Sequence, residues 1–380
     1  MKFGENHLSY CTNVHPAETF DELIETLRTD VRKVKQSVSN DEPFGVGLRL
    51  SAQMVLSMDV NRQQTLIDTL RHEDMYVFSV NGFPYGDFGV GVVKSSVYEP
   101  GWDDIKRLEY TKAIANLLVQ LPGPASRSIS TVALGNADIF QDDVRLNQAV
   151  NHLRALCIHL DTLYQETGVF VDLCLEPEPA TFLETSEDVI AFFVGYGFTD
   201  EAGPNRHVSI CYDTCHQAVM FEDPQACLEA LVDAGIRIGK MQISNAISLR
   251  EPAKQAHRSA LLEFDEPRFL HQVVANRGAL FALDLPNVRD PEAEWLQAPE
   301  WRCHFHVPLH WVGAGGLSST ADDWKAALQY AIEHQICTHF EIETYTWHVL
   351  PDHAGQSLHL WDGIRAEFDA VKPYFGGLSK

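Results

Sequence analysis

The chain has 380 residues, of which 45% are hydrophobic and 22% are charged, and its formal net charge is −24. This charge argues against general nucleic-acid binding, because recognition of a phosphate backbone needs clustered Lys and Arg, and the 29 basic residues form no stripe. The sequence contains neither the roughly 20 uninterrupted apolar residues of a membrane span nor a secretion signal at its start, so we expect a cytoplasmic protein that is not membrane-embedded, with its 8 cysteines reduced.

Short β-rich runs alternate with longer amphipathic stretches along the chain, which is typical of βα units around a parallel sheet. The expected strands are 8–14, 44–51, 75–82, 128–135, 169–176, 208–214, 238–244 and 339–345. Apolar residues recur at helical spacing in the segments 17–38, 62–73, 103–121, 146–167, 186–197, 223–235 and 321–335. Eight strands that alternate with helices predict an α/β protein with a (β/α)8 TIM barrel.

Two segments are longer than a minimal barrel requires. Residues 83–104 form a connection rich in glycine and aromatic residues, of the length expected for a loop that covers an active site. Residues 245–310 contain a helix-like stretch, a strand-like run and the sequence CHFHVPLHW. Since no Ser/Gly-rich linker divides the chain, we expect one domain over 1–380 with insertions at about 83–104 and 245–310.

Groups that can hold a divalent cation lie near the ends of four strand-like runs. They are Glu176, Asp213 with His216, His304 with His306, and Glu343. Carboxylate and imidazole suit Zn, Mn, Fe or Mg, and the catalytic face of a barrel is built from the carboxyl ends of its strands. Taken alone, the Asp213–His216 pair has another interpretation, in which Asp213 caps a helix and His216 lies at the surface. The other strand ends favour a metal site.

Two of these carboxylates have a neighbour that could take their place. Glu176 ends an apolar run, where an unpaired carboxylate is costly, and Pro177 fixes the backbone after it. We therefore expect Glu176 to point inward and Glu178 to form a salt bridge. Glu341 and Glu343 share one face of their strand, and Glu343 is nearer the catalytic end.

The two histidines of CHFHVPLHW are predicted to share one face of a strand, with Phe305 on the other. Both could ligate one metal, or one could ligate it while the other contacts substrate; the alternative is a pair of buried histidines bonded to the backbone. Gln242, at the end of the seventh strand, is a weak ligand or a substrate contact. His15 and Asn81, at the ends of the first and third strands, are substrate contacts or structural residues.

Aromatic residues accompany these groups, among them Phe83, Trp311, Tyr345 and Trp347. They can form an apolar wall for a ligand with rings or isoprenoid carbon, with Tyr345 as a contact, or they can pack under the insertions. No GxSxG, P-loop, HExxH or GxGxxG motif offers another chemistry.

The Glu at strand five, DxxH at strand six, polar residue at strand seven and Glu at strand eight resemble the xylose isomerase-like TIM-barrel superfamily, which holds sugar isomerases, epimerases and zinc-dependent apurinic endonucleases. More specifically, LSYCTNVHPAET, VNGFPYGDF, LCLEPEP, CYDTCHQAV, CHFHVPL and EIETYTWHVLP are similar to the EboE family of metabolite-traffic proteins. The second resemblance implies a bacterial protein of secondary-metabolite export or processing, with a UbiA-type prenyltransferase among its partners.

The superfamily pattern implies that Glu176, Asp213 and Glu343 bind the metal and that His216 is a ligand or substrate contact. Where many epimerases have a histidine, this chain has Gln242, and His304 or His306 could supply the missing ligand. We expect isomerisation or epimerisation of a polyhydroxylated or carbonyl-bearing small molecule, with Glu176 or Glu343 moving the proton. The alternative is a non-catalytic protein that escorts a hydrophobic precursor.

Overall fold

The computed structural model describes residues 1–39, 42–141, 143–199, 202–351 and 359–376. Eight parallel strands form its central barrel, and a short antiparallel β1 (Lys2–Phe3) adds to its first strand. The barrel strands are β2 (Asn6–Tyr10), β3 (Phe44–Arg49), β4 (Met75–Asn81), β5 (Ser126–Val132), β6 (Phe170–Glu176), β7 (Val208–Asp213), β8 (Ile238–Ile243) and β14 (His339–Ile342). All eight predicted strands are present, with bounds that differ by a few residues.

The barrel closes between its first two strands. The sheet order is β2-β14-β8-β7-β6-β5-β4-β3, and a parallel bridge between Cys11 and Gly47 joins its two ends. Every residue of β3 and β7 is buried, as expected for parallel strands that are covered on both faces. The fold is therefore a (β/α)8 TIM barrel.

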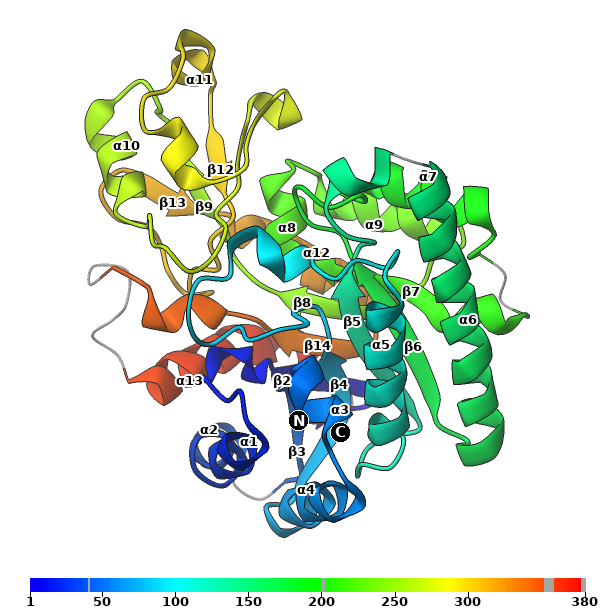
Figure 1. The fold of residues 1–380 in the computed structure, drawn as a ribbon. Coiled ribbons are helices and arrows are strands. Elements are labelled where there is room, and N and C mark those ends of the chain that lie inside the picture. The colour runs from blue at the N-terminus through cyan, green and yellow to red at the C-terminus, as the bar shows by residue number, and fades with distance from the viewer. Residues whose placement is uncertain (40–41, 142, 200–201, 352–358, 377–380) are drawn as a thin grey trace.

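Helices surround the barrel (Figure 1). They are α1 (Phe20–Thr26), α2 (Arg32–Val38), α3 (Ala52–Leu56), α4 (Val60–His72), α5 (Ile105–Leu118), α6 (Asp143–Thr167), α7 (Ser186–Tyr196), α8 (Thr214–Val219), α9 (Pro224–Asp233), α12 (Ala321–Glu333) and α13 (Leu360–Val371). The helix predicted over 17–38 is α1 and α2 joined by a π-helical turn at Leu27–Val31. The short α8 was not predicted, although it carries His216.

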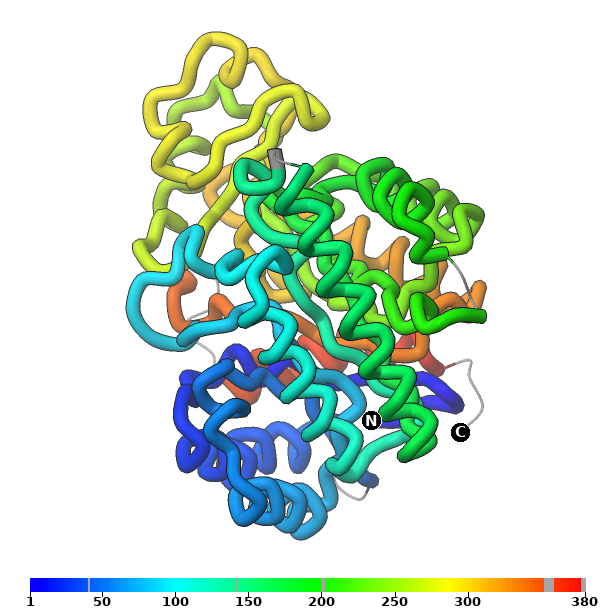
Figure 2. The backbone as a smooth tube through the Cα atoms, turned by 45° about the vertical axis from the view of Figure 1, so that its right-hand side comes forward, coloured from blue at the N-terminus to red at the C-terminus, as the bar shows by residue number. Residues whose placement is uncertain are grey.

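The second long segment builds a small antiparallel sheet of its own, ordered β11-β10-β12-β9-β13. Its elements are β9 (Ile247–Leu249), α10 (Gln255–Leu262), β10 (Val273–Ala275), β11 (Leu280–Ala282), α11 (Ala293–Gln297), β12 (Trp301–Cys303) and β13 (Leu317–Ser319). In Figures 1 and 2 most of this segment projects beyond the barrel, with the loop after β4 beside its base. That loop is bonded to it, because Val93 N–H and Lys94 N–H both donate to the Arg268 carbonyl, at 2.8 and 2.9 Å.

The barrel interior contains a buried ion pair. Lys240 on β8 and Glu341 on β14 form an ion pair at 2.7 Å, and both side chains are fully buried. Gly47 on β3 makes room for this pair, because a Cβ there would lie 1.6 Å from Glu341 Oε2. All 8 cysteines are buried and unpaired, as predicted. Across the described ranges, no helix is both long and apolar enough to cross a membrane.

Candidate metal centre and active site

Three carboxylates converge at the carboxyl ends of barrel strands. Glu176 and Asp213 are the last residues of β6 and β7, and Glu343 follows β14 by one residue. One oxygen of each lies within 4.8 Å of an oxygen of the other two. All three side chains are buried, with exposed fractions of 3%, 0% and 3%. Three carboxylates that are buried this close together need a bound cation or added protons to neutralise their negative charge.

Asp213 caps a helix with one carboxylate oxygen, while its other oxygen has no hydrogen-bond partner among the described residues. Its Oδ1 caps α8, since it accepts hydrogen bonds from Cys215 N–H at 2.8 Å and His216 N–H at 3.0 Å, and it also accepts one from Ser244 Oγ at 2.6 Å. Its Oδ2 is buried and has no hydrogen-bond partner within the described chain. Helix capping thus fixes the carboxylate and leaves one oxygen for a ligand.

Glu343 is oriented in a similar way. Its Oε1 accepts hydrogen bonds from the side-chain amides of Asn13, at 2.8 Å, and Asn81, at 2.9 Å. Asn81 was a candidate from the sequence, but Asn13 was not, although it lies near the end of the predicted strand 8–14. Glu176 Oε2 is buried and without a hydrogen-bond partner in the part of the chain that the structure describes.

Three histidines present one nitrogen each to this cluster. His216 Nδ1–H donates to the Pro177 carbonyl at 3.1 Å, His304 Nδ1–H to Gln272 Oε1 at 2.7 Å, and His306 Nδ1–H to the Glu343 carbonyl at 2.8 Å. Because each acceptor is a carbonyl oxygen, the proton belongs on Nδ1 and the lone pair on Nε2. The Nε2 atoms of His304 and His306 are buried, and neither has a hydrogen-bond partner among the described residues.

These ligand atoms form overlapping groups. Glu176, Asp213 and Glu343 make one; Asp213, His216 and His306 make a second; and Glu178, His216 and His304 make a third. Each imidazole is held through its other nitrogen, as is usual for metal-binding histidines. The unpartnered carboxylate and imidazole atoms therefore fit a divalent cation such as Zn, Mn or Fe.

Burial and neighbouring charges shift the pKa values of the three carboxyl groups in the cluster. Burial, together with the charges of Glu343 and Asp213, raises the pKa of Glu176 well above its usual range; burial and the charge of Asp213 do the same for Glu343. Burial also acts to raise the pKa of Asp213, but His216 and His306 outweigh it, and the net pKa is lowered. A bound dication reverses this tendency, because it favours the ionised carboxylates.

Glu178 departs from the sequence-based expectation. We expected it to form a peripheral salt bridge, but its side chain is buried and lines the same pocket as Glu176. Its Oε1 accepts hydrogen bonds from Tyr98 Oη at 3.0 Å and Gln272 Nε2 at 3.2 Å. Burial raises the pKa of Glu178 to about 8. Nothing in the local sequence marks Tyr98 or Gln272 as its partners.

Two predicted substrate contacts lie outside the pocket lining. Gln242 is fully buried in the barrel interior, where its Oε1 accepts a hydrogen bond from Cys211 Sγ at 2.6 Å. His15 lies beyond the end of β2, since that strand stops at Tyr10, and its Nε2 is bonded to Tyr10 Oη at 2.8 Å. Asn81, His304 and Tyr345 do line the pocket.

The expectation that His304 and His306 lie within a strand is wrong. Strand β12 ends at Cys303, and residues 304–308 are irregular. The alternation of side chains nevertheless continues, because Phe305 packs against Phe264 and His271, away from the two histidines. His304 and His306 therefore reach the candidate metal site from the loop that follows β12 of the small sheet.

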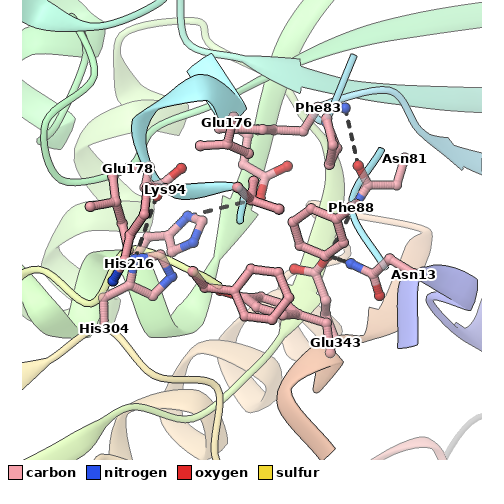
Figure 3. Close-up of a pocket in the computed structure, with 16 residues that line it drawn as sticks. Asn13, Asn81, Phe83, Phe88, Lys94, Glu176, Glu178, His216, His304 and Glu343 are labelled. Carbon is pink, nitrogen blue, oxygen red and sulfur yellow. Dashed lines mark hydrogen bonds and ion pairs between the residues drawn. The ribbon is translucent and has the colours of Figure 1, made fainter. Parts of the chain in front are cut away.

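The pocket above the cluster is partly enclosed and has an empty volume of about 490 Å3, including space that is open to solvent. Figure 3 shows Glu176, Glu178, His216, His304 and Glu343 around the same space as Phe83 and Phe88. Polar groups from the strand ends thus face side chains from the long loops, an arrangement typical of small-molecule sites.

Comparison with known proteins supports the fold. A xylose isomerase-like TIM barrel protein from Mycobacterium smegmatis, solved in complex with magnesium, is 12% identical over 99% of this chain and 98% of that chain, with a TM-score of 0.57. An L-ribulose 3-epimerase is 12% identical over 98% and 93% of the two chains, with a TM-score of 0.52. A D-tagatose 3-epimerase-like protein is 10% identical over 98% of each, also with a TM-score of 0.52.

At 10–12% identity, these structural similarities show the TIM-barrel fold alone. No family model matches the sequence, and neither does any curated protein.

Proposed function

We propose that this protein is a divalent-metal-dependent enzyme that isomerises or epimerises a small molecule with a carbonyl or hydroxyl head. The observation that supports this most directly is the convergence of Glu176, Asp213 and Glu343 on one point, with buried oxygens of Glu176 and Asp213 unpartnered among the described residues. A purely structural role for three such acids would leave their desolvation uncompensated.

The metal ligands in this proposal are Glu176, Asp213, His216, His306 and Glu343. His306 is included and Gln242 is not, because His306 Nε2 is buried without a hydrogen-bond partner among the described residues, whereas Gln242 Oε1 already accepts a hydrogen bond from Cys211 Sγ. The mixture of carboxylate and imidazole favours Zn, Mn or Fe over Mg, which prefers oxygen ligands and retained waters.

A bound dication supplies Lewis acidity to the oxygen atoms of the substrate head and so makes the neighbouring C–H more acidic. Glu176 and Glu343 then exchange the proton with carbon, in the role of general base and conjugate acid. Asn13 and Asn81 bind Glu343 Oε1 and direct its other oxygen to this task. Glu178 lines the same pocket, and because burial raises its pKa to about 8, it holds a proton near neutral pH in the metal-free protein. His304 and Tyr345 contact the substrate.

The metal content of the purified protein, measured by mass spectrometry, tests the first half of the proposal. We expect about one equivalent of a transition metal in the wild type and almost none in a D213A/H216A double variant. His310→Asn, in the exposed part of the same loop as His304, is the matched control and should keep the metal. Metal-free wild-type protein, even after reconstitution, would falsify the proposal.

Proton exchange tests the second half. The metal-loaded protein in D2O should incorporate deuterium next to the carbonyl of an α-hydroxyketone such as dihydroxyacetone, which NMR detects. Glu343→Gln should slow this exchange about 10²- to 10⁴-fold, the range for loss of a general base. Equal exchange rates in the two proteins would remove Glu343 from the mechanism.

The resemblance to the EboE family suggests a second proposal, in which the barrel serves secondary-metabolite processing or traffic in the cytoplasm beside a prenyltransferase. The apolar part of the pocket supports this alternative, since a hydrophobic precursor could be held there without reaction. A protein that binds an apolar ligand but shows no metal and no proton exchange would favour this escort role.

A further inference from the structure

One part of the pocket lining consists of three aromatic rings that contact one another. Phe88 comes from the loop after β4, Phe269 from the segment before β10, and Tyr345 from the loop after β14. Their ring centroids are 4.8 Å apart for Phe88 and Phe269, 5.2 Å for Phe88 and Tyr345, and 4.9 Å for Phe269 and Tyr345. We call these three residues the aromatic cap.

The aromatic cap is in direct contact with the candidate metal ligands. The Tyr345 ring lies 4.6 Å from the ring of His306, centroid to centroid. Val93, Val97 and Leu270 extend the apolar lining around the cap. A substrate whose head reaches the cluster therefore places the next atoms of its skeleton against hydrocarbon.

Three polar side chains that line the pocket, those of Lys94, Asn13 and Asn81, are already engaged in hydrogen bonds. The Nζ of Lys94, the one lysine or arginine among the described lining residues, bonds Asp284 Oδ2 at 2.6 Å and the Glu266 carbonyl at 3.2 Å. The side-chain amides of Asn13 and Asn81 donate to Glu343. A phosphate or carboxylate on the substrate would find no free cation here, and sugar hydroxyls pressed against the cap would lose their hydrogen bonds to water.

We infer that the substrate is a neutral molecule with a small oxygenated head and an apolar, ring-sized body, rather than an open-chain sugar or a sugar phosphate. This inference rests on the proposed function, because the cluster must bind the oxygenated head. The aromatic cap then selects the substituent next to the reacting carbon, and burial of that substituent supplies much of the affinity.

Three probes with the same α-hydroxyketone head separate the possibilities. They are 2-hydroxyacetophenone, which carries a phenyl ring, dihydroxyacetone, which carries a hydroxymethyl group, and dihydroxyacetone phosphate. Calorimetric titration of the metal-loaded protein should give a dissociation constant about 10- to 100-fold lower for the phenyl compound than for dihydroxyacetone. The phosphate should bind more weakly than either.

Variants assign the preference to the cap. Phe269→Ala and Phe88→Ala should each remove most of the advantage of the phenyl compound, because they weaken its binding more than the binding of dihydroxyacetone. Phe281→Ala is the matched control, because Phe281 lies in the same insertion and is 44% exposed. The ranking in wild-type protein stands as a test even if a cap variant does not fold.

Two results overturn the inference. Dihydroxyacetone or its phosphate binding as tightly as the phenyl compound would show that the cap does not select an apolar body, while the proposed metal-dependent chemistry would stand. Binding of none of the probes to protein that contains metal would overturn the inference together with the proposed substrate head.

Discussion

At the scale of single residues, two side-chain amides fix the orientation of the Glu343 carboxylate. Asn13 and Asn81 both bind Glu343 Oε1, and both are almost fully buried. A carboxylate held by two donors keeps one orientation before any ligand arrives. Groups that orient a metal ligand in this way typically change metal affinity 10- to 100-fold when they are removed.

Asn13→Ala tests this arrangement. The variant should bind Mn²⁺ about 10- to 100-fold more weakly than the wild type in calorimetric titration, because Glu343 loses one of its two fixed donors. Asn116→Ala, at an exposed position on α5, should bind Mn²⁺ like the wild type. Unchanged affinity in Asn13→Ala would mean that Asn81 alone orients the carboxylate.

Gly47 gives a second prediction, this time about stability. A Cβ at this position would lie 1.6 Å from Glu341 Oε2 and 2.5 Å from its Cδ, so Glu341 would have to move away from Lys240. Gly47→Ala should therefore lower the free energy of unfolding by about 1–3 kcal/mol or more, measured in urea. Gly195→Ala, on α7 with no neighbour within 4 Å of the added Cβ, should not destabilise. Equal stability of the two variants would show that the barrel interior adapts.

The sequence was a good guide to residues whose role follows from a strand end. Glu176 and Asp213 are the last residues of β6 and β7, and Glu343 directly follows β14, so their positions were readable from the pattern alone. Glu178 was misjudged because its direction depends on the turn after β6 and on hydrogen bonds from Tyr98 and Gln272, which are far away in sequence. No local pattern predicts such contacts.

At the scale of elements, two long loops cooperate above the site. The loop after β4 and the segment before β10 are joined by backbone hydrogen bonds from Val93 and Lys94 to Arg268. The salt bridge between Lys94 and Asp284, at 2.6 Å, fastens the same contact, and both side chains are largely buried, at 26% and 18% exposure. This contact holds two sides of the aromatic cap together.

Lys94→Met should loosen that contact without removing the side-chain stem. We expect the Val93 amide, which donates to Arg268, to exchange with D2O about fivefold faster, the effect of about 1 kcal/mol from a partly exposed ion pair. Lys112→Met, which removes a helical surface pair with Glu109, should leave that amide unchanged. An unaltered Val93 exchange rate in Lys94→Met would show that the backbone bonds suffice.

Whole elements were predicted unevenly for a physical reason. Barrel strands are short β-rich runs whose residues are buried on both faces, and this signal is local. The strands of the small sheet have only three residues each, too few for a periodic pattern. Residues 304–308 keep the alternation of a strand but lie outside the regular ladder of β12, although His304 N–H still donates to the Gln272 carbonyl at 2.8 Å. This alternation is why His304 and His306 were assigned to a strand.

At the scale of the molecule, stability depends on acids that the fold buries. Glu367 on α13 is 1% exposed, and its Oε1 accepts hydrogen bonds from Thr344 Oγ1 at 2.6 Å and Leu309 N–H at 3.1 Å. It thereby ties α13 to the two loops that carry Glu343 and His306. Burial raises the pKa of Glu367 from 4.5 to about 7, against the opposing effect of these hydrogen bonds.

The direction in which stability changes with pH follows from the protonation of Glu367 in the folded protein and in the unfolded chain. Between pH 4.5 and 7 the folded protein holds a proton on Glu367 and the unfolded chain does not, so the free energy of unfolding falls as pH rises through this window. The difference between the two pKa values corresponds to about 3 kcal/mol. Below pH 4.5 both states are protonated, and above pH 7 both are ionised, so Glu367 adds no slope there.

Glu367→Gln should remove this slope, because the amide resembles the protonated acid and can still accept from Thr344 and Leu309. Urea unfolding of metal-free protein at intervals from pH 4.5 to 8 should show similar stability for variant and wild type at the acid end. At pH 8 the variant should be more stable by up to about 3 kcal/mol. Glu25→Gln, at an exposed position on α1, should follow the wild-type curve throughout. Parallel curves for Glu367→Gln and the wild type would mean that Glu367 is ionised in the folded protein over the whole range, and that α13 is attached to the loops carrying Glu343 and His306 by a charge rather than by a shared proton.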